Sequence, residues 1–297
     1  MNECSVFPEN LANPGVVWPA GYARLMGKLA NTWNLAKVSW RVLQKDRELM
    51  LLPVLSVISW IVVAAVFVVP MFVLSDTGTN ESVSPAVYVL GFLATMVLSI
   101  VTVFFTGALV AGAHERLSGG DPTVSSSMRR AMSRISGLVP WALLTATVGM
   151  ILRALRERAG FLGNIVSAIG GFAWELASFL TIPAIMIDDL GAIESLKKSG
   201  SLLRDTWGEN LAARVGFGIL GVVAAIPAIV VVAVTGSIGG PLLIVGVIIA
   251  VIYVAVAFSA ITAMSAIFQT ALYLYATSGQ VPADFADSNL RNSFARK

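Results

Sequence analysis

The sequence has very few residues of the kinds that form disulfides and metal sites. Its 297 residues include one cysteine, Cys4, and one histidine, His114. A disulfide needs two cysteines, and a structural zinc site needs several Cys or His ligands. The sequence therefore excludes an internal disulfide and a zinc site built from these ligands. We expect neither a metal ion nor another cofactor.

Charged residues are also scarce. They make up 12% of the chain, whereas hydrophobic residues make up 57%, and the mean hydropathy is +0.82. Soluble domains contain about 25% charged and about 45–50% apolar residues. This composition, with its long uncharged runs, is typical of a membrane protein. The net charge of +3 does not indicate a nucleic-acid partner, because the Lys and Arg residues lie beside apolar runs, where membrane topology and anionic lipid explain them.

A cleavable signal peptide is not visible at the start of the chain. Residues 1–48 are polar to amphipathic and lack a short apolar core followed by a small-residue cleavage site. We interpret residues 1–28 as a flexible tail and expect the first span to act as an uncleaved anchor.

Six apolar runs predict an all-α membrane domain over residues 29–276, followed by a cytoplasmic tail at 277–297. A helix needs about 20 apolar residues to cross about 30 Å of hydrocarbon. The predicted spans are residues 49–74, 83–113, 137–152, 161–187, 211–234 and 241–276. We expect four prolines to kink or begin spans: Pro53, Pro140, Pro183 and Pro227. Small residues predict close helix packing at Gly107, Ala108, Ala111 and Gly112.

Three shorter segments predict basic amphipathic helices on the inner face of the membrane, at residues 29–45, 124–138 and 192–207. In each, apolar residues recur at helical spacing while basic residues fall off that stripe. Each Lys or Arg near an anionic leaflet contributes about 1 kcal/mol of attraction. We therefore predict lipid-headgroup contacts at Lys37, Arg41, Arg129, Arg130, Lys197 and Lys198. The alternative is that these residues only set the topology.

The distribution of basic residues predicts the orientation of the chain. With six spans and both termini inside, 17 of the 20 Lys and Arg residues fall on the inner side. The positive-inside rule then predicts a multi-pass protein of the cell membrane with cytoplasmic N- and C-termini. The three exceptions, for which the sequence offers no explanation, are Arg153, Arg156 and Arg158.

The chain also shows internal similarity. With a shift of 160 residues, Ser39 aligns with Ser199, and Ser118-Gly119 aligns with Ser278-Gly279. A different shift aligns residues 127–131 with residues 195–199. We interpret these matches as three units, at about residues 29–122, 123–190 and 191–282, each an amphipathic helix followed by two spans. The alternative is the ordinary alternation of basic loops and spans in any multi-pass protein.

Three segments resemble a known family: residues 39–56 (SWRVLQKDRELMLLPVLS), 174–207 and 270–285 (TALYLYATSGQVPADF). The family comprises six-span bacterial and archaeal membrane proteins and is known only as a domain of unknown function. The resemblance covers about residues 30–297 and implies fold and location, but no catalytic residues. The chain also resembles, more weakly, the membrane domain that is fused to some glycerophosphodiester phosphodiesterases. We expect no hydrolase domain in this chain to accompany that resemblance.

Glu175 is the sharpest candidate for a functional residue. It lies midway along the fourth predicted span, where an ionisable side chain costs on the order of 3 kcal/mol. We predict a buried polar or ion site formed by Glu175 with Gln269 and Thr262, and with Thr102 and Thr106 as further neighbours. The alternatives are a hydrogen-bonded structural carboxyl or a helix at another depth. For Asp188, Asp189 and Glu194 we favour helix capping over metal binding.

The sequence supports three possible functions to different degrees. The favoured one is a non-enzymatic membrane protein that organises lipids or partner proteins at the cytoplasmic face, either alone or as a homo-oligomer. The second is a small-molecule or ion transporter or channel that uses the carboxylate of Glu175. A lipid-modifying enzyme would need acids, histidines or serines clustered at the interface, and the sequence shows no such cluster.

Overall fold

In the computed structural model the chain is helical wherever it is described. The structure describes residues 37–75, 85–158, 160–207, 212–279 and 281–285, and no strand occurs among them. The predicted tail at 1–28 and the start of the first amphipathic helix lie outside the described residues, as does most of the predicted tail at 277–297. The all-α fold class is confirmed for the described part.

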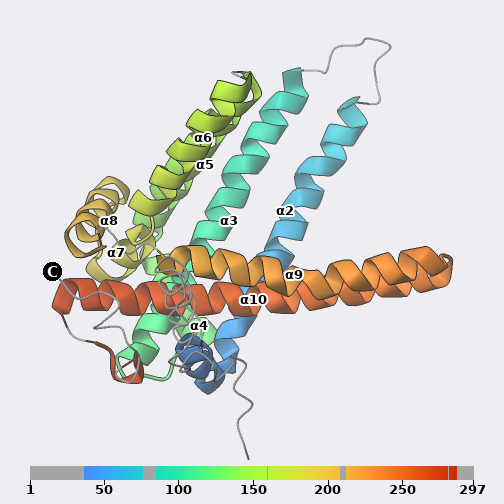
Figure 1. The fold of residues 1–297 in the computed structure, drawn as a ribbon. Helices are drawn as coiled ribbons and strands as arrows, with labels where there is room; N and C mark the ends of the chain where they lie inside the picture. The colour runs from blue at the N-terminus through green and yellow to red at the C-terminus, as the bar shows by residue number, and fades with distance from the viewer. Residues whose placement is uncertain (1–36, 76–84, 159, 208–211, 280, 286–297) are drawn as a thin grey trace, which may run out of the picture.

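Four long helices run side by side: α2 (Leu51–Ser75), α3 (Pro85–Leu117), α5 (Ile135–Arg158) and α6 (Gly160–Ala177) (Figure 1). Five stretches of the described chain are long and apolar enough to cross a membrane: Glu48–Phe72, Pro85–Leu117, Ile135–Arg158, Leu162–Asp188 and Pro241–Ser278. The protein therefore has the build of a multi-pass membrane protein. The fifth predicted span, residues 211–234, is not among these stretches, and only a shorter apolar stretch, Ala224–Ser237, is found in its region.

The fourth predicted span is broken rather than continuous. α6 ends at Ala177, and a separate helix, α7 (Thr181–Asp188), follows after a turn. Pro183 lies in the first turn of α7, where its missing N–H is tolerated. If α6 and α7 formed one continuous helix, the Pro183 ring would clash with the carbonyl of Phe179, four residues earlier. The buried N–H of Leu180 donates instead to Ser199 Oγ at 3.0 Å. Pro183 thus begins a helix, as predicted.

Replacing Ser199 by alanine is expected to lower the free energy of unfolding by about 1–2 kcal/mol, because the buried N–H of Leu180 loses its acceptor. Thermal unfolding of the detergent-solubilised protein, followed by circular dichroism, measures the change. Ser201→Ala is the matched control, because that hydroxyl is exposed and donates only to the Lys198 carbonyl of its own helix. Equal losses in the two variants would contradict this role for Ser199.

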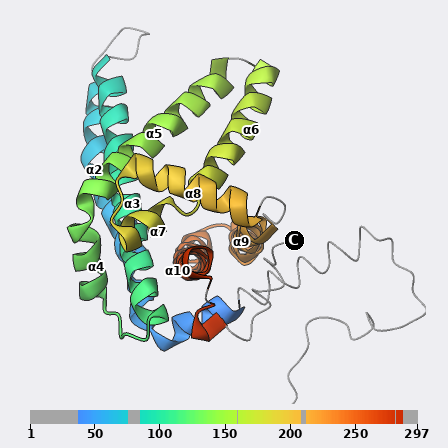
Figure 2. The ribbon, with the colours of Figure 1, turned by 90° about the vertical axis from the view of Figure 1, so that its left-hand side faces the viewer.

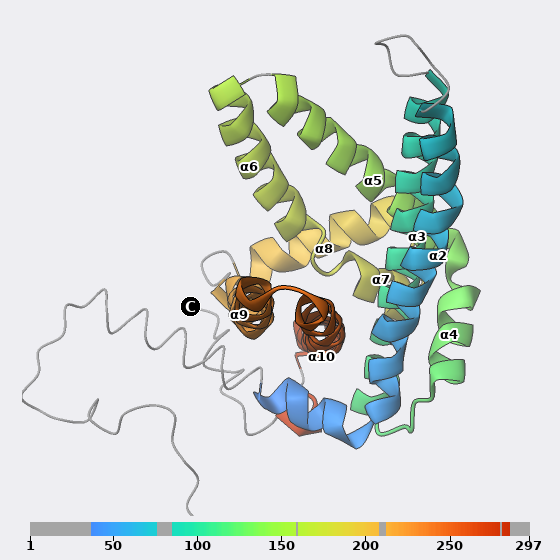
Figure 3. The ribbon, with the colours of Figure 1, turned by 90° about the vertical axis from the view of Figure 1, so that its right-hand side faces the viewer.

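The last two long helices form a hairpin that crosses the other four. α9 (Ala212–Ile238) and α10 (Pro241–Ser278) pack against each other along their length. They run steeply across α2, α3, α5 and α6 (Figures 1 and 3). The sequence predicted that these two helices are the fifth and sixth membrane spans, and it gave no sign that they run across the other four. Apart from the buried Gly246 and Ala250, the first half of α10 exposes mostly apolar side chains, so no polar face specifies how the hairpin should lie.

Each short helix packs near an end of one or more of the long helices. Residues 37–45 are helical and lead through the 3₁₀ turn η2 (Arg47–Met50) into α2. α4 (Val124–Ser133) lies along α3, and α8 (Ala192–Trp207) lies across the ends of α5 and α6 (Figure 2). A last 3₁₀ turn, η3 (Ala283–Phe285), follows α10. Each short helix precedes two long ones, as the proposed units require, but the three-fold repeat itself stays a prediction.

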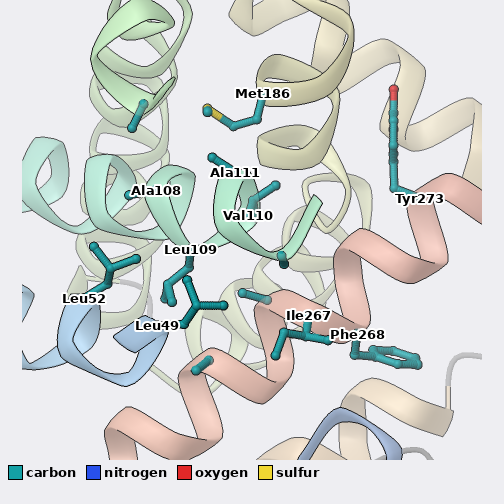
Figure 4. Packing of buried hydrophobic residues seen from close by; sticks show 14 of the residues in the cluster. Leu49, Leu52, Ala108, Leu109, Val110, Ala111, Met186, Ile267, Phe268 and Tyr273 are labelled. Atoms are coloured by element: carbon teal, nitrogen blue, oxygen red, sulfur yellow. The ribbon is translucent and has the colours of Figure 1, made fainter. Parts of the chain in front are cut away.

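The core lies where the second half of α10 meets α3, α7 and η2. Leu49, Leu109 and Ile267 belong to it and are shown at close range in Figure 4. The predicted small residues of α3 are buried there. At Gly112 an added methyl group would come within 2.5 Å of Leu49 Cδ2 and 2.6 Å of Ser127 Oγ. The absence of a side chain therefore lets η2 and α4 approach α3 closely.

Candidate functional site

A cluster of polar side chains joins three helices at the end of α7. The Asp188 carboxylate accepts a hydrogen bond from the hydroxyl of Tyr273 on α10 and forms an ion pair with Lys198 on α8. The Lys198 ammonium also lies 5.8 Å from the centre of the Tyr273 ring, within range of a cation–π contact. We call Asp188, Lys198 and Tyr273 the polar node. It fixes α8 to α10, which places the crossing hairpin against the rest of the molecule.

Asp189, the acidic residue next to Asp188, has a different partner. Asp189 ends α7 in a left-handed conformation, with φ of 57°, and its carboxylate pairs with Arg134 at the end of α4. Asp188 and Asp189 therefore hold neighbouring helices together, whereas the sequence analysis favoured a role in capping α8. Glu194 does lie in the first turn of α8, where its charge favours the positive end of the helix dipole.

Two further ion pairs connect η2 to neighbouring elements. The buried carboxylate of Asp46 binds the guanidinium of Arg116, which also reaches Asp121 at 2.8 Å. Lys45 pairs with Asp284 of η3. These contacts tie residues far apart in the chain, from the start of α2 to the end of α10. They hold separate parts of the chain together.

Most of the basic residues predicted to contact lipid headgroups are exposed. Lys37 and Arg41 lie on the exposed side of the first helix, Arg129 and Arg130 on that of α4, and Lys197 on that of α8. Within the described residues, no carboxylate lies at salt-bridge distance from Arg129, Arg130 or Lys197. Lys198 differs, because Asp188 occupies its ammonium group.

Glu175, Thr262 and Gln269 do not form one buried site. Glu175 is exposed on α6, which packs chiefly against α5 and α8, whereas Thr262 and Gln269 belong to α10. Gln269 Nε2 donates to Ser265 Oγ of its own helix at 3.3 Å. The expected convergence fails because α10 crosses the bundle instead of running beside α6.

The threonines named as neighbours of Glu175 do come together elsewhere. Thr102 and Thr106 of α3 and Thr262 of α10 line one cavity of about 420 Å³, which α2 closes on its other side. Trp60 of α2 donates its indole N–H to Thr102 Oγ1 at 2.8 Å.

Sequence reasoning missed Trp60 and Tyr273, since the sequence around an aromatic residue in an apolar run does not indicate which residue it will bind. In the described part of the chain, no three His, Cys, Asp or Glu side chains are grouped to hold a metal ion.

Comparison with known families gives one match. Residues 85–283 match the model of a family of unknown function, DUF6159. The chain belongs to this family. Its assignment to an uncharacterised family is thereby confirmed. The comparison carries no support for the likeness to the membrane domain of glycerophosphodiester phosphodiesterases. No curated protein matches the chain.

Proposed function

We propose that the protein is a non-enzymatic, multi-pass protein of the cell membrane that organises anionic lipids, or the partner proteins that share their charge, at its cytoplasmic face. The observation that carries this proposal is the set of exposed basic side chains on α4 and α8, which lack acidic partners among the described residues. Unpaired cations at the end of an apolar bundle attract anionic headgroups.

The placement of α4 and α8 supports a shared surface for this binding. Both helices lie on the outside of the long bundle, α4 along α3 and α8 across the ends of α5 and α6 (Figures 1 and 2). Each buries a stripe of small residues, namely Ser127 and Ala131 on α4 and Ala192, Ser195 and Ser199 on α8. Their basic residues consequently project away from the core. The proposed orientation, with both termini cytoplasmic, puts this surface against the inner leaflet.

A transporter is the second function, and the structure offers it less support. Its candidate carboxylate, Glu175, lies on an exposed side of α6 and not in the cavity that the threonines line. That cavity has no charged lining residue. The broken helix α6–α7 is a feature shared with transporters, but here the freed N–H of Leu180 is bound by Ser199 Oγ.

Neutralising the basic surface should weaken its binding of anionic lipid. In the triple variant Arg129→Gln, Arg130→Gln and Lys197→Gln, the loss of about 1 kcal/mol per charge is expected to lower the affinity for phosphatidylglycerol roughly 100-fold. Native mass spectrometry of protein purified from vesicles of phosphatidylglycerol and phosphatidylcholine counts the anionic lipids that remain bound.

The matched control removes three arginines from the other end of the bundle, in Arg153→Gln, Arg156→Gln and Arg158→Gln. A smaller loss is expected, because Arg153 already pairs with Glu157 at 3.7 Å and Arg156 donates to Ser167 at 3.4 Å. Equal loss of phosphatidylglycerol in the two triple variants, or no loss in the first, would refute the proposed binding surface.

A further inference from the structure

The cavity between α2, α3 and α10 has the size and lining of a ligand site. Its volume of about 420 Å³ falls within the range of about 300–1,000 Å³ that is usual for small-molecule pockets. The walls are apolar, with Ile61 and Ala64 from α2, Leu109 from α3 and Phe258 from α10. Ile61 and Phe258 are 64% and 57% exposed at its rim, so the cavity can be entered from the surrounding membrane.

Two hydroxyl groups that line this cavity, those of Ser56 and Thr262, have no hydrogen-bond partner among the described residues. Thr102 and Thr106 each donate to a carbonyl one turn earlier in α3, at 2.8 Å. Ser56 and Thr262, although they also sit in helices, make no such bond, and neither forms any hydrogen bond with another described residue. A polar group left unpaired in an apolar setting costs free energy. The two hydroxyls can therefore donate to an oxygen atom that a ligand brings in.

A second hollow, along the crossing hairpin, adjoins the cavity. That groove, of about 700 Å³, lies between α9 and α10 and shares Val57 and Phe258 with the cavity. Among the residues whose side chains the structure describes, no charged one lines either hollow. Two neighbouring apolar hollows suit two hydrocarbon chains joined by a polar group without net charge.

The position of the hydroxyls fits the same kind of ligand. Ser56 lies five residues into α2, about 8 Å from the start of that helix, whereas Ala64 lies about 20 Å from it. An ester group at Ser56 would thus lie near the membrane surface, with its chain extending toward Ala64. This depth matches a lipid of the leaflet that faces α4 and α8.

We propose that the cavity and its adjoining groove bind one uncharged, ester-linked diacyl lipid of the diacylglycerol type. Its two chains occupy the two hollows, and its ester carbonyl oxygens accept hydrogen bonds from Ser56 and Thr262. This site is separate from the basic surface of α4 and α8, and the two can be tested independently.

Fluorescence quenching at Trp60 tests the proposal directly, since Trp60 lines the cavity. The whole chain is reconstituted in dioleoyl phosphatidylcholine vesicles that contain a few mole per cent of a probe lipid with a dibrominated acyl chain. Three probes are compared: a diacylglycerol, its ether-linked analogue without carbonyl groups, and a phosphatidylcholine. The contribution of Trp60 is the difference in quenching between the wild-type protein and the Trp60→Phe variant.

At the same mole fraction, the diacylglycerol probe is expected to quench Trp60 several-fold more than the phosphatidylcholine probe. Removing both hydroxyls, in Ser56→Ala with Thr262→Val, should lower the preference for the diacylglycerol over its ether analogue by about fivefold per lost hydrogen bond. Ala64→Leu fills the cavity and should abolish the excess quenching. Ala65→Leu is its matched control, because Ala65 is exposed on another side of α2 and does not line the cavity.

Equal quenching by the three probes in the wild-type protein would overturn the proposal, and this comparison needs no variant to fold. Excess quenching that survives in Ala64→Leu would overturn it as well. A preference for the phosphatidylcholine probe would assign the cavity to bulk membrane lipid and would likewise exclude the uncharged ligand.

Discussion

Gly246→Ala is expected to lower the free energy of unfolding by about 3 kcal/mol, because the added methyl group has no room between α9 and α10. A Cβ atom at Gly246 would lie 2.2 Å from Thr235 Oγ1 and 2.7 Å from Thr235 Cβ. Thr235 cannot turn away, since its hydroxyl donates to the Val231 carbonyl at 2.8 Å and its Cβ is part of the helix. The two helices must separate to accept even one methyl group.

Thermal unfolding of the purified protein measures this loss, and Gly236→Ala is the control. Gly236 lies in the same hairpin, but its added Cβ would meet only Leu243 Cδ1 at 3.8 Å, an ordinary contact. The control is expected to leave the melting temperature unchanged or slightly higher, because alanine favours a helix over glycine. Restoring space with Thr235→Gly should recover part of the stability of Gly246→Ala. Similar melting temperatures for Gly246→Ala and Gly236→Ala would show that α9 and α10 do not pack as described.

Asp188→Ala is expected to destabilise the protein by about 2–3 kcal/mol, since a carboxylate that two partners share is lost. The fully buried Tyr273 would keep a hydroxyl without its acceptor, and Lys198 would keep a charge without its counter-ion. Because the node fixes α8 to α10, hydrogen exchange should increase most at the end of α10 and along α8. Thermal unfolding and hydrogen–deuterium exchange measure the two effects.

Asp189→Ala is the natural comparison, because the neighbouring carboxylate is 63% exposed and its ion pair with Arg134 lies nearer the solvent. Exposed pairs contribute about 0–1 kcal/mol, so the expected loss is smaller. A double-mutant cycle between Asp188→Asn and Tyr273→Phe should give a coupling energy of about 1 kcal/mol. A coupling energy near zero would mean that the hydrogen bond between Tyr273 and Asp188 contributes nothing to stability.

The candidate sites show how far sequence reasoning reaches in an apolar chain. The exposed positions of Arg129, Arg130 and Lys197 followed from helical spacing, because an amphipathic helix buries its apolar stripe whatever it packs against. Glu175 was located correctly in the fourth apolar run, but its expected partners depended on which helices are neighbours. Thr102, Thr106 and Thr262 were expected to gather, and they do so around Trp60 rather than around Glu175.

The broken helix and the polar node also contain contacts that local sequence patterns do not predict. Pro183 predicted a helix start or a kink, because proline fits the first turn of a helix and removes a backbone hydrogen bond further in, as Pro140 and Pro227 do inside α5 and α9. No local pattern predicted that the N–H of Leu180 would donate to Ser199, 19 residues later in the chain. The link between Asp188 and Tyr273 spans 85 residues. Both contacts depend on the packing of separate helices.

The sequence by itself determined that the protein is helical, that it is built for a membrane, and that basic amphipathic helices begin at residues 124 and 192. These properties follow from composition and from periodicity within one segment, which are independent of the rest of the chain. The predicted segment 124–138 runs too far, because α4 ends at Ser133 and α5 begins at Ile135.

Only the tertiary structure decided that α9 and α10 cross the bundle, which side chains share the cavity, and which bases remain unpaired. An apolar helix such as α10 has no polar face to orient it, so its position is set by close contacts such as those at Gly112, Gly246 and Asp188.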